Sequence, residues 1–377
     1  MNYNRKKIVC ATTVPQSLGF FRDVMLKMME GEYEITAISS PGEKMQRFQN
    51  STPDIKCVEV PMKRQIALGS DVKSLWKMMS VLRKERPIMI HSMTPKAGMI
   101  SMVAGWLTGV PVRVHTFTGL VWPTSMGWKR KVLMMTDRLT CACATHVIPE
   151  GQGVMNDLKN GHITNKPLKV LGYGNVKGID LDVFNPLRFD TQKTDKFTFL
   201  FVGRIVGDKG INELVEAFIR IHEEHPNTQL QLIGNYNTGT DPVSPQTYQR
   251  MMSHEAIHAV GPKFGDDLLT EYAQADCFVM PSYREGFPNT VIEAGAMGLP
   301  CVVTDINGSR EIIDSGKNGL IVPSKDVDLL YKAMKTMLCD DVARMRMASN
   351  ARPMIACRFD KKFVQACLIS YYEDILN

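Results

Sequence analysis

Short apolar runs alternate with helical patterns along almost the whole chain of 377 residues. The strand candidates in the first half are 7–14, 34–39, 57–62, 88–93, 112–117, 145–149 and 168–172. Those in the second half are 197–203, 228–234, 256–261, 276–282, 300–305 and 319–324. Strands separated by helices are typical of parallel sheets with crossover connections. The alternation therefore predicts an α/β fold, and the chain length predicts more than one domain.

The stretch 281–305, PSYREGFPNTVIEAGAMGLPCVVTD, carries the most chemistry. A buried strand leads through a tight loop into a helix that we expect to begin at Pro288. Glu285 lies in the loop, and Glu293 lies roughly 7.5 Å further along the helix axis. Two carboxylates so placed can hold two parts of one elongated ligand, while N–H groups at the helix start form an anion site. Helix capping and a solvated surface would also account for the two glutamates, so the pattern alone does not decide.

A second loop of the same kind follows the strand expected at 197–203. It carries Arg204 and Lys209 and leads into a helix expected from about Ile211. In α/β sheets ligands gather at the carboxyl ends of the strands, where both loops would lie. An arginine fork and a lysine point charge together suit a diphosphate.

The segments 203–210 (GRIVGDKG) and 285–293 (EGFPNTVIE) together resemble the signature of the retaining glycosyltransferases of family 4. Segments 13–21, 91–98, 172–180 and 307–313 extend the likeness over almost the whole chain, to bacterial capsular and exopolysaccharide enzymes. The resemblance implies an α/β structure of two Rossmann-like domains, the GT-B fold, with a cleft between them. It also implies a hexosyl or N-acetylhexosaminyl transferase that works with retention.

The resemblance gives roles to the charged residues of the two loops. Arg204 and Lys209 would stabilise the leaving diphosphate, and Glu285 would orient the sugar as the third catalytic residue. Glu293 would hold the ribose hydroxyls. The other residues expected to bind substrate are Gly19, Lys96, Thr118, Phe264, Gly286, Phe287, Asn289 and Thr290.

Three expected substrate contacts lie in the first half of the chain. Gly19 follows the first strand, and Lys96 would meet an acceptor phosphate, although a solvated lysine at a helix start would look the same. Many family 4 members have a histidine before the glycine of the motif at 115–120, whereas this chain has Thr118. His115 could take its place. Phe264, in a loop of the second half, could stack on uracil or be a plain loop residue.

Charge is unevenly divided: residues 1–185 carry a balance of +11 and residues 186–377 a balance of −5, within a net charge of +6. The basic half is either a well-solvated surface or one that meets an anionic membrane. The amphipathic segment 121–135, with two tryptophans and a KRK turn, fits a membrane interface, and it fits a core-facing helix slightly better. We expect no membrane-spanning segment, because the longest apolar stretch has about 15 residues, and no signal peptide, because the apolar run near the start is too brief. We expect a cytoplasmic protein, at the inner face of the cell membrane if the basic half binds lipid.

The polar, proline-punctuated stretch 184–196 is the best linker. We predict an acceptor-binding domain at 1–184 and a nucleotide-sugar domain at 185–358. By resemblance, the amphipathic C-terminal helix at 359–377 packs back on the first domain.

The expected partners are a nucleotide-sugar donor, UDP-linked, and a lipid-linked or glycan acceptor, with no nucleic acid. We expect no cofactor and no metal, because no Asp-x-Asp pair stands at a strand end and the nine cysteines lack zinc spacing. Two alternatives stay open: a UDP-sugar 2-epimerase of the same architecture, and a non-catalytic nucleotide-sugar-binding protein.

Overall fold

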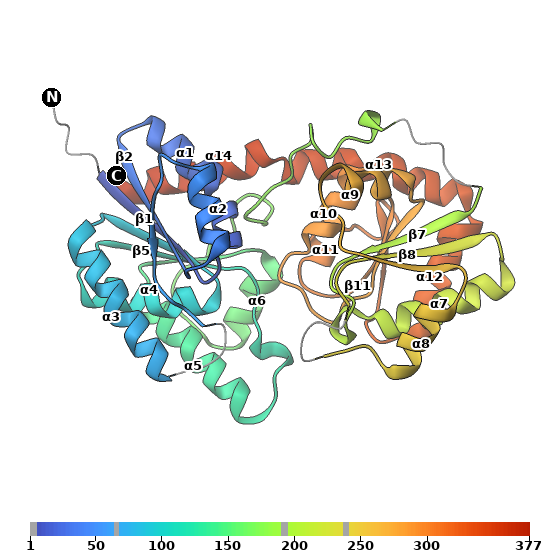
Figure 1. The fold of residues 1–377 in the computed structure, drawn as a ribbon, viewed down its shortest axis with the longest axis horizontal. Coiled ribbons are helices and arrows are strands. Elements are labelled where there is room, and N and C mark those ends of the chain that lie inside the picture. Colours follow the sequence, from blue (N-terminus) through green and yellow to red (C-terminus); the bar gives the residue numbers. More distant parts are fainter. Residues whose placement is uncertain (1–5, 64–67, 190–194, 237–240) are drawn as a thin grey trace. The chain divides into compact units, whose positions relative to one another are not determined.

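The structure is a computed structural model, and it describes residues 6–63, 68–189, 195–236 and 241–377. The chain divides into two compact units (Figure 1). The first unit runs to Lys177 and includes Lys362–Asn377, and the second is Gly178–Lys361. The sequence had placed the change of domain at 184/185 and the start of the C-terminal helix at 359.

The first unit is built on a six-stranded parallel sheet in the order β3-β2-β1-β4-β5-β6. Its strands are β1 (Lys6–Thr12), β2 (Tyr33–Ser39), β3 (Lys56–Glu59), β4 (Met89–Met93), β5 (Val112–Phe117) and β6 (His146–Pro149). Alternate residues of β1 enter opposite cores, because side chains of a strand point to its two faces in turn. Ile8 and Cys10 join one apolar cluster, and Val9 and Ala11 join the other. Both faces are therefore buried, as the continuous apolar runs predict.

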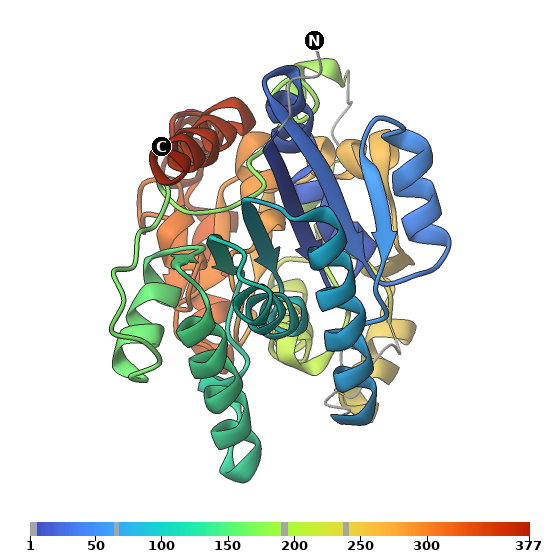
Figure 2. The same cartoon turned by 90° about the vertical axis from the view of Figure 1, so that its left-hand side faces the viewer.

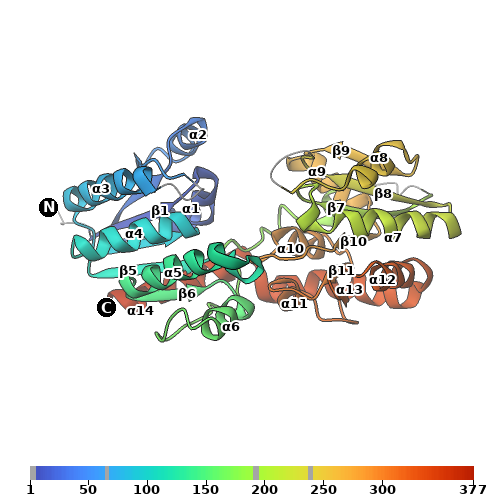
Figure 3. The same cartoon turned by 90° about the horizontal axis from the view of Figure 1, so that it is seen from below.

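Helices cover both faces of this sheet (Figures 2 and 3). One face carries the 3₁₀ helix η1 (Pro15–Phe20), α1 (Arg22–Glu30), α2 (Glu43–Ser51) and α14 (Lys361–Leu376). The other carries α3 (Leu68–Glu85), α4 (Pro95–Leu107), α5 (Gly127–Cys143) and α6 (Gln152–Asn160), with η2 (Trp122–Thr124) before α5. Helices α3, α4 and α5 lie side by side in that order (Figure 3).

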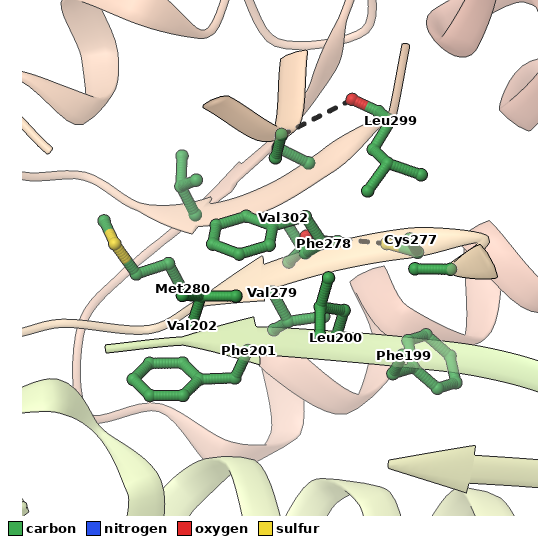
Figure 4. Close-up of a cluster of buried hydrophobic side chains, with 14 of the residues drawn as sticks. Phe199, Leu200, Phe201, Val202, Cys277, Phe278, Val279, Met280, Leu299 and Val302 are labelled. Carbon is green, nitrogen blue, oxygen red and sulfur yellow. Dashed lines mark hydrogen bonds between the residues drawn. The ribbon is translucent and has the colours of Figure 1, made fainter. Parts of the chain in front are cut away.

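The second unit has the same construction, with a parallel sheet in the order β12-β11-β10-β7-β8-β9. Its strands are β7 (Phe197–Val202), β8 (Thr228–Ile233), β9 (Ile257–Gly261), β10 (Cys277–Met280), β11 (Cys301–Thr304) and β12 (Gly319–Val322). Its helices are η3 (Pro186–Arg188), η4 (Gly207–Lys209), α7 (Ile211–Glu224), α8 (Pro245–Ser253), α9 (Gly265–Gln274), α10 (Asn289–Ala296), α11 (Ser309–Ile312), α12 (Val327–Cys339) and α13 (Asp341–Phe359). The central strands are apolar on both faces, as the side chains of β7 and β10 show (Figure 4).

These two sheets confirm the predicted α/β fold of two Rossmann-like domains. One strand candidate was wrong: segment 168–172 makes only an isolated bridge between Leu168 and Val147. Within the described residues, no helix is both long and apolar enough to cross a bilayer. All nine cysteines are free thiols.

Helix α14 returns to the first unit and is fixed there by a buried polar contact. Tyr372 is 1% exposed and its hydroxyl bonds to Nδ1 of His91 in β4. The other ring nitrogen of His91 lies 2.7 Å from the hydroxyl of Thr116 in β5. Burial lowers the pKa of His91 well below its ordinary value, so the ring is neutral. His91 therefore holds the last helix against the sheet.

Candidate functional site

A glycine allows the loop after β7 to contact the loop after β10. Gly210 has a left-handed φ of +70°, and a Cβ there would stand 2.1 Å from the carbonyl oxygen of Pro281. Only glycine allows this approach. In addition, the backbone N–H of Tyr283 donates to the carbonyl of Asp208 over 2.9 Å. The two loops that the sequence predicted to share one sheet edge therefore touch.

Charged side chains from both loops meet at this contact. Lys209 and Glu285 form an ion pair, and each side chain is 17% exposed. Arg204 lies 3.6 Å from Oδ1 of Asp208. Arg284 lies 3.3 Å from Oδ2 of the same carboxylate. The structure therefore brings Arg204, Lys209 and Glu285 to one edge.

The sequence interpretation missed two members of this cluster, Asp208 and Arg284. Asp208 stands between two arginines that come from different loops. Arg284 is a third cation, with 41% of its side chain exposed. It is adjacent to Glu285 in the sequence, so the charge of that loop was a signal that pointed to it.

The start of α10 presents backbone rather than side chains. Pro288 is the N-cap and α10 begins at Asn289, one residue later than predicted. Phe287 is 6% exposed, and its ring lies 5.5 Å from that of Phe359, so its side chain belongs to the core. The Thr290 hydroxyl points to the sulfur of Met280, 3.6 Å away. The N–H groups of the first turn remain the groups suited to an anion.

A glycine on a third loop, the one after β11, allows that loop to lie close to the turn at 286–288. Gly308 has a φ of +75°, and a Cβ there would lie 2.6 Å from both the Gly286 carbonyl oxygen and Cδ of Pro288. Gly308 is also the N-cap of α11, with its N–H bonded to the Glu311 carboxylate over 3.2 Å. Ser309, the first residue of α11, is buried.

Glu293 lies inside α10 and is 9% exposed. The hydroxyl of Tyr272, in α9, donates to its Oε2 over 3.1 Å. Burial raises the pKa of Tyr272 well above its ordinary value, which keeps the phenol protonated as a donor. Tyr272 thus fixes the orientation of the carboxylate, a role that no sequence pattern indicated.

Phe264 is the N-cap residue of α9 and is 75% exposed. Its neighbour Lys263 is engaged in an ion pair with Glu271. An exposed ring beside a sheet edge agrees with either reading of the sequence, base stacking or a plain loop.

The first unit has a cavity of about 600 Å³ at the carboxyl ends of β1 and β4, and one of its three predicted site residues lines it. Lys96 lines it, but its ammonium group lies 2.6 Å from Asp71, and both side chains are 10% exposed. Gly19 lies in η1, and nothing stands within 4 Å of where its Cβ would be. Thr118 is half-buried after β5. Neither Gly19 nor Thr118 is among the residues that line this cavity.

His115 cannot replace the missing histidine, because it is enclosed in the core. It is 1% exposed and its Nδ1 lies 2.9 Å from the Ser92 hydroxyl. A Cβ on Gly98 would lie 2.3 Å from Cε1 of His115, so the ring is stacked directly on the backbone of α4. Burial lowers the pKa of His115 to about 3. The ring is a neutral packing group.

Among the residues that the structure describes, no group of three or more His, Cys, Asp or Glu side chains could hold a metal ion. At the sheet edge of the second unit, Asp208 and Glu285 are paired with cations.

Two family models match the chain, and known proteins resemble it over most of its length. Residues 184–354 match the family model described as glycosyl transferases group 1, and residues 21–174 match the glycosyl transferase 4-like domain. The capsular polysaccharide biosynthesis glycosyltransferase CapM of Staphylococcus aureus is 30% identical over 99% of this chain and 98% of its own length. An Escherichia coli UDP-Gal:alpha-D-GlcNAc-diphosphoundecaprenol alpha-1,3-galactosyltransferase is 28% identical over 79% of this chain and 78% of its own.

A solved structure shares the fold over the full length. HepE (Alr3699) of Anabaena, in complex with UDP, has a TM-score of 0.79 at 17% identity, covering 98% of this chain and all of its own. At that identity the likeness concerns the fold alone. The shared architecture is the GT-B arrangement of two Rossmann-like domains.

Proposed function

The chain belongs to the family 4 glycosyltransferases, and from this membership we propose that it moves a sugar from a UDP-sugar to a lipid-linked glycan. The transfer would build a surface polysaccharide and retain the anomeric configuration. The observation that carries the proposal is the ion pair of Lys209 with Glu285, which joins two loops at the carboxyl ends of the second sheet.

The donor would lie at this edge. As the bond between the anomeric carbon and the diphosphate breaks, negative charge gathers on the diphosphate. Arg204, Lys209 and Arg284 come from both loops and would stabilise that charge, together with N–H groups at the start of α10. A charge-assisted hydrogen bond contributes ~1.5–3 kcal/mol. Because cations and a helix start supply this stabilisation, we propose that transfer needs no divalent metal.

Glu285 and Glu293 would hold the two ends of the donor. When Lys209 turns to the diphosphate, the Glu285 carboxylate is released to accept hydrogen bonds from sugar hydroxyls. Glu293, oriented by Tyr272, would accept from the ribose hydroxyls. Retention follows if the acceptor hydroxyl attacks the face from which the diphosphate leaves, as in the resembled enzymes.

The acceptor proposal draws on the relatives. CapM is a capsular polysaccharide enzyme, and the Escherichia coli relative acts on a sugar linked to diphosphoundecaprenol. We place the acceptor on the first unit, where the cavity beside Lys96 is the hollow at the sheet edge.

The outer faces of α3, α4 and α5 suit contact with an anionic membrane. Exposed cations on these helices are Lys73, Lys77, Arg83, Lys84, Lys129, Arg130, Lys131 and Arg138. Their acidic residues, Asp71, Glu85 and Asp137, are all buried. Trp76, Trp106 and Trp128 are each more than half exposed. Cations with exposed tryptophans are typical of a membrane interface, where each cation contributes ~1 kcal/mol. We propose that this surface rests on the membrane.

The central test is incubation of the purified protein with a panel of UDP-sugars, with and without a lipid-linked glycan. We expect UDP to raise the melting temperature, because it binds the native state. We also expect a glycosylated lipid only when donor and acceptor are both present. This product should still form when EDTA is added. An epimerised UDP-sugar without acceptor would indicate the epimerase instead. UDP binding with no transfer to any acceptor would contradict the enzymatic proposal.

The membrane contact is tested by flotation with phosphatidylglycerol liposomes. Binding should weaken as salt rises, because exposed charges are screened. The double variant Lys73→Glu/Lys77→Glu should float less than Lys27→Glu/Lys44→Glu, which changes the same charge on the opposite helix layer. Equal flotation of the two variants, or binding insensitive to salt, would remove this surface from the proposal.

A further inference from the structure

The cavity of the first unit differs in character from a sugar site. It lies between the loop after β1, the start of α4, and the segment from Val121 into α5. We propose that it binds the apolar chain of a phosphorylated isoprenoid lipid, with the phosphates at its rim. The inference rests on the proposed function, because it assigns a place to the lipid part of the acceptor.

The walls of the cavity are largely apolar. Val14 and Pro95 line one side, and Val121, Trp128 and Leu133 line the other. An apolar chain gains from contact with such walls because its surface leaves water. Sugar hydroxyls would lose their water there and find few replacements.

Three polar residues that line the cavity, Thr13, Thr94 and Lys96, are already engaged by the protein. The hydroxyls of Thr13 and Thr94 lie 2.7 Å apart. The hydroxyl of Thr94 also accepts from the N–H of Thr13, and that of Thr13 accepts from the N–H of Ala97, both over 3.0 Å. The ammonium group of Lys96 is paired with the buried Asp71. These groups shape the floor of the cavity and offer little to a glycan.

The rim supplies what the phosphates of such a lipid require. Lys129 lines the cavity from the first turn of α5 and is exposed. Among the described residues it has no ion-pair partner, so its charge is available to an anion. Trp128, 74% exposed, stands beside it and presents an aromatic surface to the chain.

The volume of the cavity determines how many isoprene units of the lipid can enter it. About 600 Å³ lies within the ~300–1,000 Å³ of ligand sites, which is room for a few isoprene units and not for a whole polyprenol. Each methylene that leaves water improves affinity about fourfold. Affinity should therefore rise with chain length while the added units still enter the cavity.

The test is calorimetric titration of the full chain, without nucleotide, with inorganic pyrophosphate and with isopentenyl, geranyl and farnesyl diphosphate. We expect affinity to rise at least tenfold from the C5 to the C15 compound, with pyrophosphate weakest. Val121→Trp should fill the cavity and lower affinity for farnesyl diphosphate at least tenfold. Val342→Trp, at a site 75% exposed on α13 of the second unit, is the matched control and should leave it unchanged. Lys129→Ala should weaken all the diphosphates, whereas Lys131→Ala, two residues along the same helix, should not.

Equal affinity for the C5 and C15 compounds, or equal behaviour of Val121→Trp and Val342→Trp, would overturn the proposal. So would competition by dodecyl phosphocholine as strong as that by geranyl diphosphate, because the cavity would then accept any alkyl chain. Failure here, with UDP stabilisation and transfer intact, would leave the proposed function standing. Binding that depends on the length of the prenyl chain, without any transfer, would support the lipid site and contradict the proposed function.

Discussion

The carboxyl ends of the two sheets are built on one plan and carry opposite chemistry. In each sheet the strands of the unit lie in the order third, second, first, fourth, fifth, sixth. In the second unit, loops at this edge present Arg204, Lys209, Arg284 and Glu285. In the first, the corresponding edge presents hydroxyls and apolar side chains around a cavity. The topology thus fixes where a ligand binds, and the loop residues decide which ligand it is.

The difference extends to the role of charge. In the first unit, several carboxylates are buried. Asp71 pairs with Lys96, and Glu85 pairs with Lys7 and Lys56. Asp137 is buried in α5. In the second unit, two cations of the edge stand at the surface, because the side chains of Arg204 and Arg284 are 55% and 41% exposed. Charge in the first unit should therefore govern stability, and charge at the edge of the second should govern the reaction.

The largest effect is expected from Lys96→Met. The substitution removes the paired cation from a carboxylate whose side chain is only 10% exposed, which should lower the free energy of unfolding by ~3–5 kcal/mol. Denaturant unfolding measures this loss, and Lys96→Met/Asp71→Leu should recover most of it. Lys73→Met, an exposed lysine on α3, is the control and should change stability by no more than ~0.5 kcal/mol. Normal stability with a raised KM for acceptor would instead support the acceptor role that the sequence predicted for Lys96.

Asp137→Asn should change how stability depends on pH. Burial raises the pKa of Asp137 to about 7, whereas an unfolded chain has ~3.9. Between these values the native state binds the extra proton, so this group lowers the free energy of unfolding as pH rises from about 4 to about 7. In Asp137→Asn the free energy of unfolding should not show this decrease. At pH 8 it should exceed that of the native chain by a few kcal/mol. Unfolding curves at four pH values test this, with Asp54→Asn, an exposed carboxylate, as control. Parallel pH profiles of Asp137→Asn and the native chain would contradict it.

Arg204→Ala and Lys209→Ala should each lower turnover at least tenfold with the fold intact, since ~1.4 kcal/mol is a factor of ten. Each removes a cation from the diphosphate and leaves the cores untouched. The control is Arg220→Ala, which removes a cation that pairs with Asp328 on the outer side of α7. Near-normal rates in both edge variants would remove the contrast between the two edges.

Periodicity predicted the sheets because both are buried on two faces, and such strands appear as continuous apolar runs. It failed at 168–172, a run interrupted by Lys169, where Leu168 makes a single bridge. The meeting of Lys209 with Glu285 followed from the rule that ligand loops share the carboxyl edge. The resemblance to family 4 supplied the roles of these residues, not their proximity.

What the sequence could not supply depends on packing between distant segments. His115 and Lys96 look alike in sequence, as polar residues beside strand ends. Only the fold shows that Gly98 seals the first into the core and that Asp71 holds the second. Tyr272 was missed because its contact depends on how α9 lies against α10.

Tyr272→Phe should give the smallest effect and the most specific one. It removes the hydroxyl that donates to Glu293 over 3.1 Å, a loss of about 1 kcal/mol in the orientation of that carboxylate. If Glu293 holds the ribose, KM for the donor should rise about fivefold while kcat stays nearly constant, because the ribose contact is the same before and during transfer. Tyr331→Phe removes a comparable bond, to Glu224 over 2.6 Å, away from the edge, and should leave KM unchanged. Equal KM values in the two variants would mean that Tyr272 serves the core alone. Donor binding at the sheet edge of the second unit would then not depend on the bond from Tyr272 to Glu293.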